Sequence, residues 1–139
     1  MCESIYYHHL GTDIRQVFSN PTAVLPVKLK RGAILLPWGR RQTQAGVLPL
    51  GGWARLESIH AGRWDRFFPK SVKLPVASFM QRDIEGREHW YELIKGQYIQ
   101  GLVAREGQER RVYIVTITPE AEDAIHERWP RIVSEVLFS

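Results

Sequence analysis

The only cysteine of the chain, Cys2, stands directly after the initiator Met1. Its small side chain would permit removal of Met1, which would leave a free α-amine beside a thiol. The reference pKa values of these two groups are about 7.7–8.0 and about 8.5, so both are partly available as nucleophiles near neutral pH. Such a 1,2-aminothiol condenses with an aldehyde, because the amine forms a Schiff base and the thiol closes a five-membered thiazolidine. From position alone, a nucleophile and an accidental second residue are equally good interpretations of Cys2.

The histidines offer acid/base chemistry but no metal site. His126, in "IHERWP", is a candidate general acid/base because its unperturbed pKa lies near about 6.5; the alternative is a structural histidine. No metal-ligand spacing such as HExxH connects the other four histidines, His8, His9, His60 and His89. The chain also lacks a P-loop, a GxGxxG and a GxSxG motif. We therefore expect neither a metal nor another cofactor.

The segment "GGWARLES" at 51–58 could bind an anion. Its two glycines would let the backbone approach a ligand closely. Arg55 and Glu57 alternate onto one face of a strand, where they could hold an anion and orient a catalytic group. The alternative is a structural ion pair of little energetic value.

The length and composition predict a single domain, 1–139, with a mild preference for polyanionic binding partners. The net charge is +4, and basic residues gather at 28–32, 39–41 and 109–111 in a chain with five tryptophans. Cations near aromatic residues suit single-stranded nucleic acid, although a solvated surface with core tryptophans explains them too. A single cysteine and the lack of a signal peptide or a membrane-length apolar run favour a cytoplasmic protein.

The predicted elements are mostly strands. A helix is expected at 11–18, and a second at 118–129, with Thr118 as N-cap and Pro119 in its first turn. The pattern predicts a hairpin of 88–94 with 97–106 across the turn at 95–96. The strand candidates are 23–29, 33–38, 46–59, 73–80, 88–94, 97–106 and 110–118. Strands that dominate over a few short flanking helices predict an α+β domain with a mainly antiparallel, β-rich core.

Several segments, taken in order, resemble one known family. They are Met1-Cys2, "WARLE" at 53–57, "LPVASFMQ" at 74–81, "GQYIQGLVARE" at 96–106 and "VYIVTITPEAEDAIHERWP" at 112–130. The order and spacing resemble the SOS-response-associated peptidase (SRAP) family, whose members carry Met-Cys-Gly-Arg, Asn-Ala-Arg-x-Glu and Ile-His-x-Arg-Met-Pro. The resemblance spans nearly the whole chain, which is shorter than typical members.

The resemblance implies a β-rich, partly barrel-like fold and a role in binding single-stranded or damaged DNA. In that family the N-terminal cysteine, exposed by autocatalytic removal of Met1, couples covalently to the ring-opened aldehyde of an abasic site. Cys2 matches the nucleophile, and His126 matches the histidine that assists proton transfer. The residues that the resemblance and the basic groups place against DNA are Trp38, Arg40, Arg41, Trp53, Arg55 and Glu57.

Three departures bear on activity. Trp53 stands where the family has an asparagine, and Glu3 and Ser4 follow the cysteine in place of glycine and arginine. Gln81 stands where the family has its catalytic glutamate; a second alignment gives that position to Glu92, but Gln81 better keeps the spacing to 101–102. A glutamine amide cannot exchange a proton usefully near neutral pH. We expect cross-linking to be slowed or lost, which leaves a DNA-binding module without catalysis, or an unrelated β-rich RNA-binding or interaction domain, as the alternatives.

Overall fold

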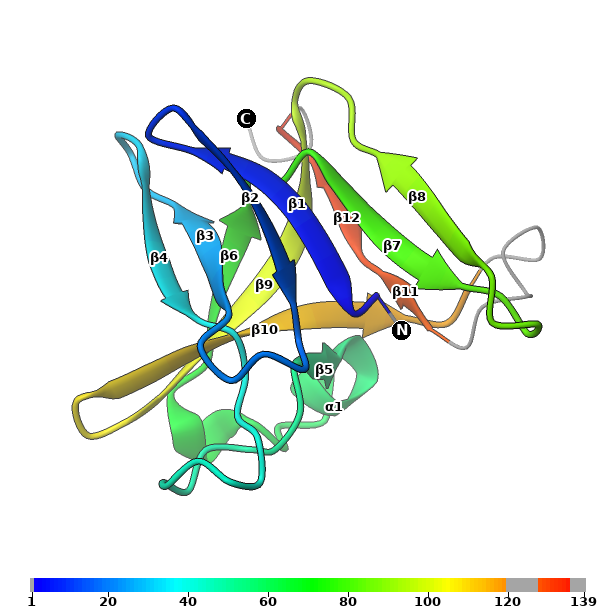
Figure 1. Cartoon of the computed structure of the whole chain (residues 1–139). Coiled ribbons are helices and arrows are strands. Elements are labelled where there is room, and N and C mark those ends of the chain that lie inside the picture. Colours follow the sequence, from blue (N-terminus) through cyan, green and yellow to red (C-terminus); the bar gives the residue numbers. More distant parts are fainter. Residues whose placement is uncertain (1, 120–127, 136–139) are drawn as a thin grey trace.

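The computed structural model describes residues 2–119 and 128–135, and most of them lie in strands (Figure 1). This described part of the chain is β-rich, with one short α-helix and open sheets, in agreement with the expected α+β class. The elements are β1 (Ser4–His9), β2 (Thr12–Val17), β3 (Val24–Lys28), β4 (Ala33–Pro37), β5 (Trp53–Arg55), α1 (Leu56–His60), the 3₁₀ turn η1 (Asp65–Phe67), β6 (Lys70–Leu74), β7 (Ser78–Arg82), β8 (Glu88–Glu92), β9 (Gln97–Glu106), β10 (Glu109–Ile117), β11 (Trp129–Pro130) and β12 (Ile132–Ser134).

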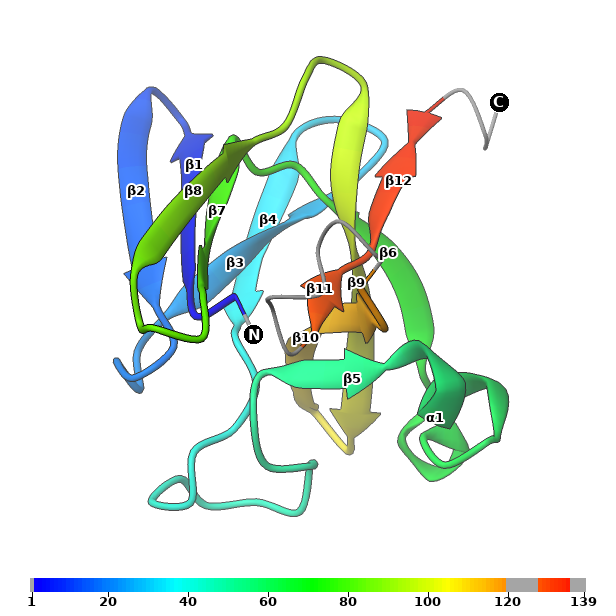
Figure 2. The ribbon, with the colours of Figure 1, turned by 90° about the vertical axis from the view of Figure 1, so that its right-hand side faces the viewer.

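A sheet built on β9 and β10 forms the centre of the fold (Figures 1 and 2). Its strand order is β11-β10-β9-β12, with β5 added parallel to β10 and β6 added antiparallel to β9. The strand predicted at 110–118 is confirmed as β10, and the strand at 97–106 is confirmed as β9. Gly107, at a φ of +60°, opens the tight turn that joins them, a conformation that favours glycine.

Both faces of the central sheet are buried, which explains the continuous apolar run of β10. Val112 and Ile114 belong to the larger core, which also holds Cys2 and Trp38. Tyr113 and Val115 face the opposite way, into a smaller core against Trp64 and Phe67. Successive side chains of a strand point to opposite faces, so a strand buried on both sides must be apolar throughout.

The second sheet, in the order β2-β1-β7-β8, overturns the helix predicted at 11–18. That segment is strand β2, which pairs with all of β1 from Ser4↔Val17 to His9↔Thr12. Ile14 packs on the larger core, and the side chain of Gln16 accepts a hydrogen bond from the Val24 backbone at 3.2 Å. Because successive side chains of a strand point to opposite faces, Ile14 and Gln16 both point inward. Pairing with β1 satisfies the backbone hydrogen-bonding groups of β2. These two contributions outweigh the helical spacing of the apolar residues.

The predicted hairpin of 88–94 with 97–106 is also wrong. β8 pairs with β7 in the second sheet, whereas β9 pairs with β6, β10 and β12 in the central sheet. The turn through Gly96, at a φ of +87°, carries the chain from one sheet to the other. The strand predicted at 73–80 divides between the same two sheets, because Pro75 lacks the N–H that would continue the ladder.

One predicted strand is shortened, and one predicted helix falls mostly outside the described residues. The strand expected over 46–59 is only β5, and the chain turns into α1 at Leu56. The helix expected over 118–129 falls largely on residues 120–127, outside the described residues, and its last residue, Trp129, lies in β11. Within the described part of the chain, no helix has the length and apolar character needed to cross a membrane.

Candidate functional site

The C-terminal end of β10 brings two of the SRAP-like segments together. Thr116 pairs with Arg55 of β5 on one side and with Pro130 of β11 on the other. The "WARLE" segment and residues 128–130 therefore flank one strand, although Glu57 and Arg128 are 71 positions apart in the sequence. Backbone pairing, rather than a loop contact, fixes their relative position.

The Arg128 side chain joins these segments, and its contacts with Glu57 and Thr116 are called here the Arg128 junction. Its guanidinium donates to both carboxylate oxygens of Glu57, at 3.0 and 3.1 Å, and to the Thr116 carbonyl oxygen at 2.7 Å. The Arg128 side chain is only 7% exposed, whereas that of Glu57 is 58% exposed. These hydrogen bonds lower the pKa of Glu57 to about 2. A bidentate pair of this kind adds geometric specificity to the ionic attraction.

Gln81 joins the same junction from the second sheet. The residue is fully buried, and its side-chain Nε2 donates to the Arg128 carbonyl oxygen at 2.5 Å. Its Oε1 is buried and finds no hydrogen-bond partner among the described residues. Most buried polar atoms are satisfied, so this oxygen marks an incomplete polar site.

Cys2 lies in the larger core, at the end of β1 that pairs with β7. Its carbonyl oxygen accepts a hydrogen bond from the Trp53 indole at 3.0 Å. The next residue, Glu3, forms an ion pair of 2.7 Å with Arg82, which follows Gln81 on β7. The N-terminal segment is thus held between Trp53 of β5 and Arg82 of β7.

The Cys2 thiol is fully buried. Desolvation raises its pKa to about 12, and the nearby N-terminal charge and a hydrogen bond with Trp53 oppose this shift only in part. The thiol is therefore protonated at neutral pH, unlike the low-pKa thiolates of typical reactive cysteines.

Trp53 and Trp38 share an aromatic cluster with Phe18. The rings of Phe18 and Trp53 are 4.8 Å apart, and those of Trp38 and Trp53 are 6.1 Å apart. Trp38 has no exposed surface and donates its indole N–H to the Gly52 carbonyl oxygen at 3.0 Å. It therefore packs behind Trp53 in the core. Trp53 and Phe18 are both partly exposed, so this side of the cluster borders solvent.

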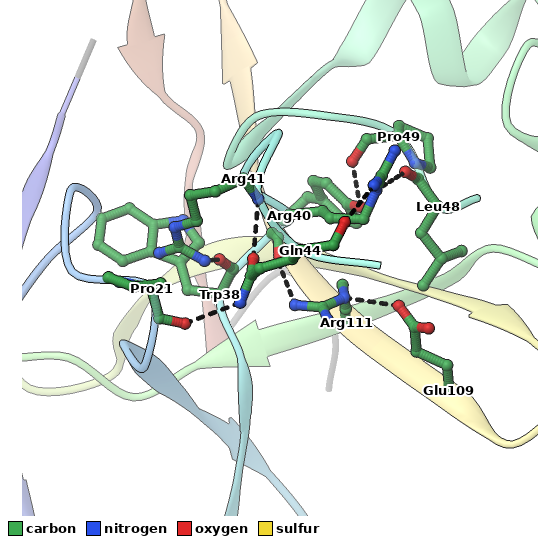
Figure 3. Close-up of polar contacts among 11 residues, drawn as sticks. Pro21, Trp38, Arg40, Arg41, Gln44, Leu48, Pro49, Glu109 and Arg111 are labelled. Atoms are coloured by element: carbon green, nitrogen blue, oxygen red, sulfur yellow. Dashed lines mark hydrogen bonds and ion pairs between the residues drawn. The ribbon is translucent and has the colours of Figure 1, made fainter. Parts of the chain in front are cut away.

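Arg40 and Arg41 form an internal network rather than a row of outward charges (Figure 3). Arg40 donates to the carbonyl oxygens of Leu48 and Gln44, at 2.6 and 2.7 Å. Arg41 donates to the carbonyl oxygens of Phe18 and Trp38, at 2.8 and 2.5 Å. Burial lowers the pKa of Arg41, and the neighbouring charge of Arg111 adds to this effect. Both arginines hold the segment after β4 in place, and their expected contact with DNA stays a prediction.

The remaining predicted residues fall in different places. Arg55 and Glu57 line an open hollow of about 460 Å³ beside Arg63. Glu92 is exposed at the end of β8, opposite Ser78, and lines a different hollow with Trp90. Gln81, not Glu92, therefore reaches the Arg128 junction. His126 lies outside the described residues, two positions before Arg128.

Arg128 belongs to the "HERWP" motif but was not predicted as a site residue. Its signal lay in the motif itself, yet its partner Glu57 could only be found in three dimensions. The described residues contain no group of three or more His, Cys, Asp or Glu side chains placed to hold a metal ion.

Comparison with known proteins gives no assignment: no protein-family model, no curated protein and no solved structure matches the chain.

Proposed function

We propose that this protein binds single-stranded DNA in the manner of the SRAP family and couples to abasic sites through Cys2. The observation that carries the proposal is the junction of Arg128, Glu57 and Gln81 beside the Cys2 segment. Four segments that resemble the family, spread over the whole chain, contribute to this one place.

The covalent step needs only the aminothiol and an aldehyde. Once Met1 is removed, the Cys2 amine nitrogen attacks the aldehyde carbon, and loss of water leaves an imine. The thiol sulfur then adds to the imine carbon, and the thiol proton ends on the nitrogen, which closes the thiazolidine. The amine acts first, because the imine carbon that the sulfur attacks exists only after the amine has condensed with the aldehyde.

The residues around Cys2 would position the strand rather than perform acid/base chemistry. Arg55, at the mouth of the hollow beside Arg63, is placed to meet a phosphate. The partly exposed Trp53 offers a surface on which a base or sugar could pack. The Gln81 amide can hydrogen-bond the reacting groups but cannot exchange a proton, so His126 or water would do so.

The test is incubation of the purified protein with single-stranded DNA that carries one abasic site, followed by denaturing electrophoresis. We expect a shifted band that is absent from Cys2→Ala and from DNA without the abasic site. Intact mass spectrometry of the same sample reports whether Met1 has been removed, since a blocked amine cannot form the imine. A sample without Met1 that yields no Cys2-dependent band refutes the covalent step.

A second candidate is a binding module without chemistry, and the burial of the Cys2 thiol favours it. On this hypothesis the junction serves only to shape a DNA-binding surface. Salt-dependent binding of single-stranded DNA that is equal in the unmodified protein and in Cys2→Ala, with no covalent band from either, would select this candidate.

A further inference from the structure

A groove away from Cys2 separates the β3–β4 hairpin from the central sheet. β3 lies beside β6, and β4 contacts β10 (Figure 1). Residues of the hairpin and of the sheet together line the groove. The groove has a volume of about 680 Å³, with Val27, Leu36 and Val103 among its apolar lining residues. It lies toward the start of β10, at Arg110, whereas the Arg128 junction lies at the opposite end of that strand, at Thr116.

Several basic side chains line the rim of this groove. Lys28 and Lys30 come from the hairpin, and Lys70, Lys73 and Arg110 come from the sheet. Among the described residues that line the groove, none is acidic. Lys30, Lys70 and Arg110 are exposed and form no ion pair within the part of the chain that the structure describes. Such a concentration of charge repels itself and attracts a polyanion.

The register of β9 and β10 places Arg105 and Arg110 on one face of the sheet and the acidic Glu109 on the other. Arg105 of β9 stands directly opposite Arg110 of β10, a like-charged pair that costs stability. The neighbouring Glu109 points to the other face, where it pairs with Arg111 at 2.6 Å. The acidic side chain that could neutralise Arg110 is therefore turned away from the groove.

An exposed aromatic ring stands just beyond the groove. Phe68 is 64% exposed. Its backbone has a left-handed φ of 51°, which residues other than glycine rarely adopt. The Arg105 guanidinium lies 5.0 Å from the centre of its ring. The ring is thus largely exposed and lies next to a cation, two residues before Lys70 of the rim. Sites for single-stranded nucleic acid combine exposed aromatic rings, on which bases stack, with cations that meet the backbone.

We propose that this groove binds a stretch of single-stranded nucleic acid, with its cations on phosphates and Phe68 stacked on a base. The proposal deepens the proposed function, because it gives the same strand a second contact surface away from Cys2. An acidic lipid surface would also satisfy the cations and the exposed Leu29 of the hairpin. The exposed ring with its arginine partner favours nucleic acid, since lipid headgroups offer nothing to stack on it.

The experiment measures binding of a fluorescent oligothymidine without an abasic site, about 12 nucleotides long, within the roughly 4–16 nucleotides typical of single-strand modules. Its dissociation constant is followed against salt concentration by fluorescence anisotropy. The groove variant is Lys70→Gln with Arg110→Gln. The matched control is Arg87→Gln with Lys95→Gln, which removes the same charge from exposed positions on the connections that flank β8. Thermal unfolding of each variant checks that the fold is intact.

Each lost phosphate contact lowers the slope of log Kd against log salt by about 0.7, so we expect the groove variant to lower it by about 1.4 and the control to leave it unchanged. Phe68→Ala should weaken binding by about 5-fold or more at an unchanged slope, while Phe68→Tyr keeps the stacking surface and the affinity. Equal slopes for the groove variant and the control would overturn the proposal.

Two further arms separate this proposal from the proposed function. If the groove variant lowers the slope while no Cys2-dependent covalent band forms, the groove stands and the covalent step fails. If the band forms and the slope stays unchanged, the groove fails and the covalent step stands. Binding to phosphatidylserine vesicles that depends on Lys70 and Arg110, with no binding of the oligonucleotide, would assign the groove to a lipid surface and overturn the proposal.

Discussion

Replacing Gln81 by glutamate would make the stability of this protein depend on pH. The position is fully buried, and the amide donates to the Arg128 carbonyl oxygen at 2.5 Å. A protonated carboxyl in Gln81→Glu can donate in the same way, whereas an ionised one meets the carbonyl oxygen with a second acceptor. Burial and this hydrogen bond both favour the neutral form, so the folded-state pKa of the introduced carboxyl rises above its unfolded value of about 4.3.

The sign follows from linkage. A raised folded-state pKa preserves stability at low pH and costs stability as the pH rises between the unfolded and folded values. If burial raises this pKa by about 3 units, the variant loses about 3 kcal/mol more of its unfolding free energy near pH 8 than near pH 5, relative to the unmodified protein. Gln81→Met, which has no ionisable group, should show no such difference.

Urea unfolding of the three proteins near pH 5 and near pH 8 measures these free energies directly. A deficit of Gln81→Glu that is equal at both pH values would refute the reasoning, because it would mean that water or a cation already solvates this position. The same variant, assayed with abasic-site DNA, reports whether a carboxyl at this position restores cross-linking.

Three other perturbations test the surrounding structure. Glu57→Gln should cost about 1–2 kcal/mol of unfolding free energy at neutral pH, because the nearly buried Arg128 loses its ionic partner, with the value discounted for the exposure of Glu57. Since the pKa of Glu57 falls from 4.5 to about 2 on folding, its contribution is present above pH 4.5 and is lost as the pH falls toward 2, and urea titrations of Glu57→Gln should lack that acid loss. Iodoacetamide near pH 8 should alkylate Cys2 about a thousand-fold more slowly in the folded chain than in denaturant, because burial raises its pKa to about 12; mass spectrometry that finds equal rates would contradict this. Gly39→Ala should lower the unfolding free energy by more than the roughly 1–3 kcal/mol that a left-handed φ costs, because the new Cβ would lie 2.1 Å from the Gly51 carbonyl oxygen. Gly11→Ala, whose Cβ would meet open space, should lose only the free energy that its left-handed φ costs. Similar thermal unfolding of the two variants would contradict the predicted clash at Gly39.

Sequence patterns located the strands better than their partners. β10 could be predicted because β-branched residues fill a strand that is buried on both faces. β2 could not, because Ile14 and Phe18 are four residues apart, which fits one face of a helix or of a strand, and only the pairing of β2 with β1 decides between them. The partners of β8 and β9 depend on the direction of the chain at Gly96, which local patterns do not encode.

The candidate site divides in the same way. The presence of a thiol at position 2, of cations at 28–32 and of an amide at position 81 is a matter of sequence alone. The tertiary structure decided that Gln81 rather than Glu92 reaches Arg128, since the two lie in neighbouring strands whose register separates them. It also decided that the Cys2 thiol is buried and protonated, that Arg40 and Arg41 are turned inward, and that the described lining of a distant groove holds basic but no acidic side chains. Each of these depends on which long-range groups surround a side chain, because desolvation and pairing, not residue type, determine its charge state and its availability.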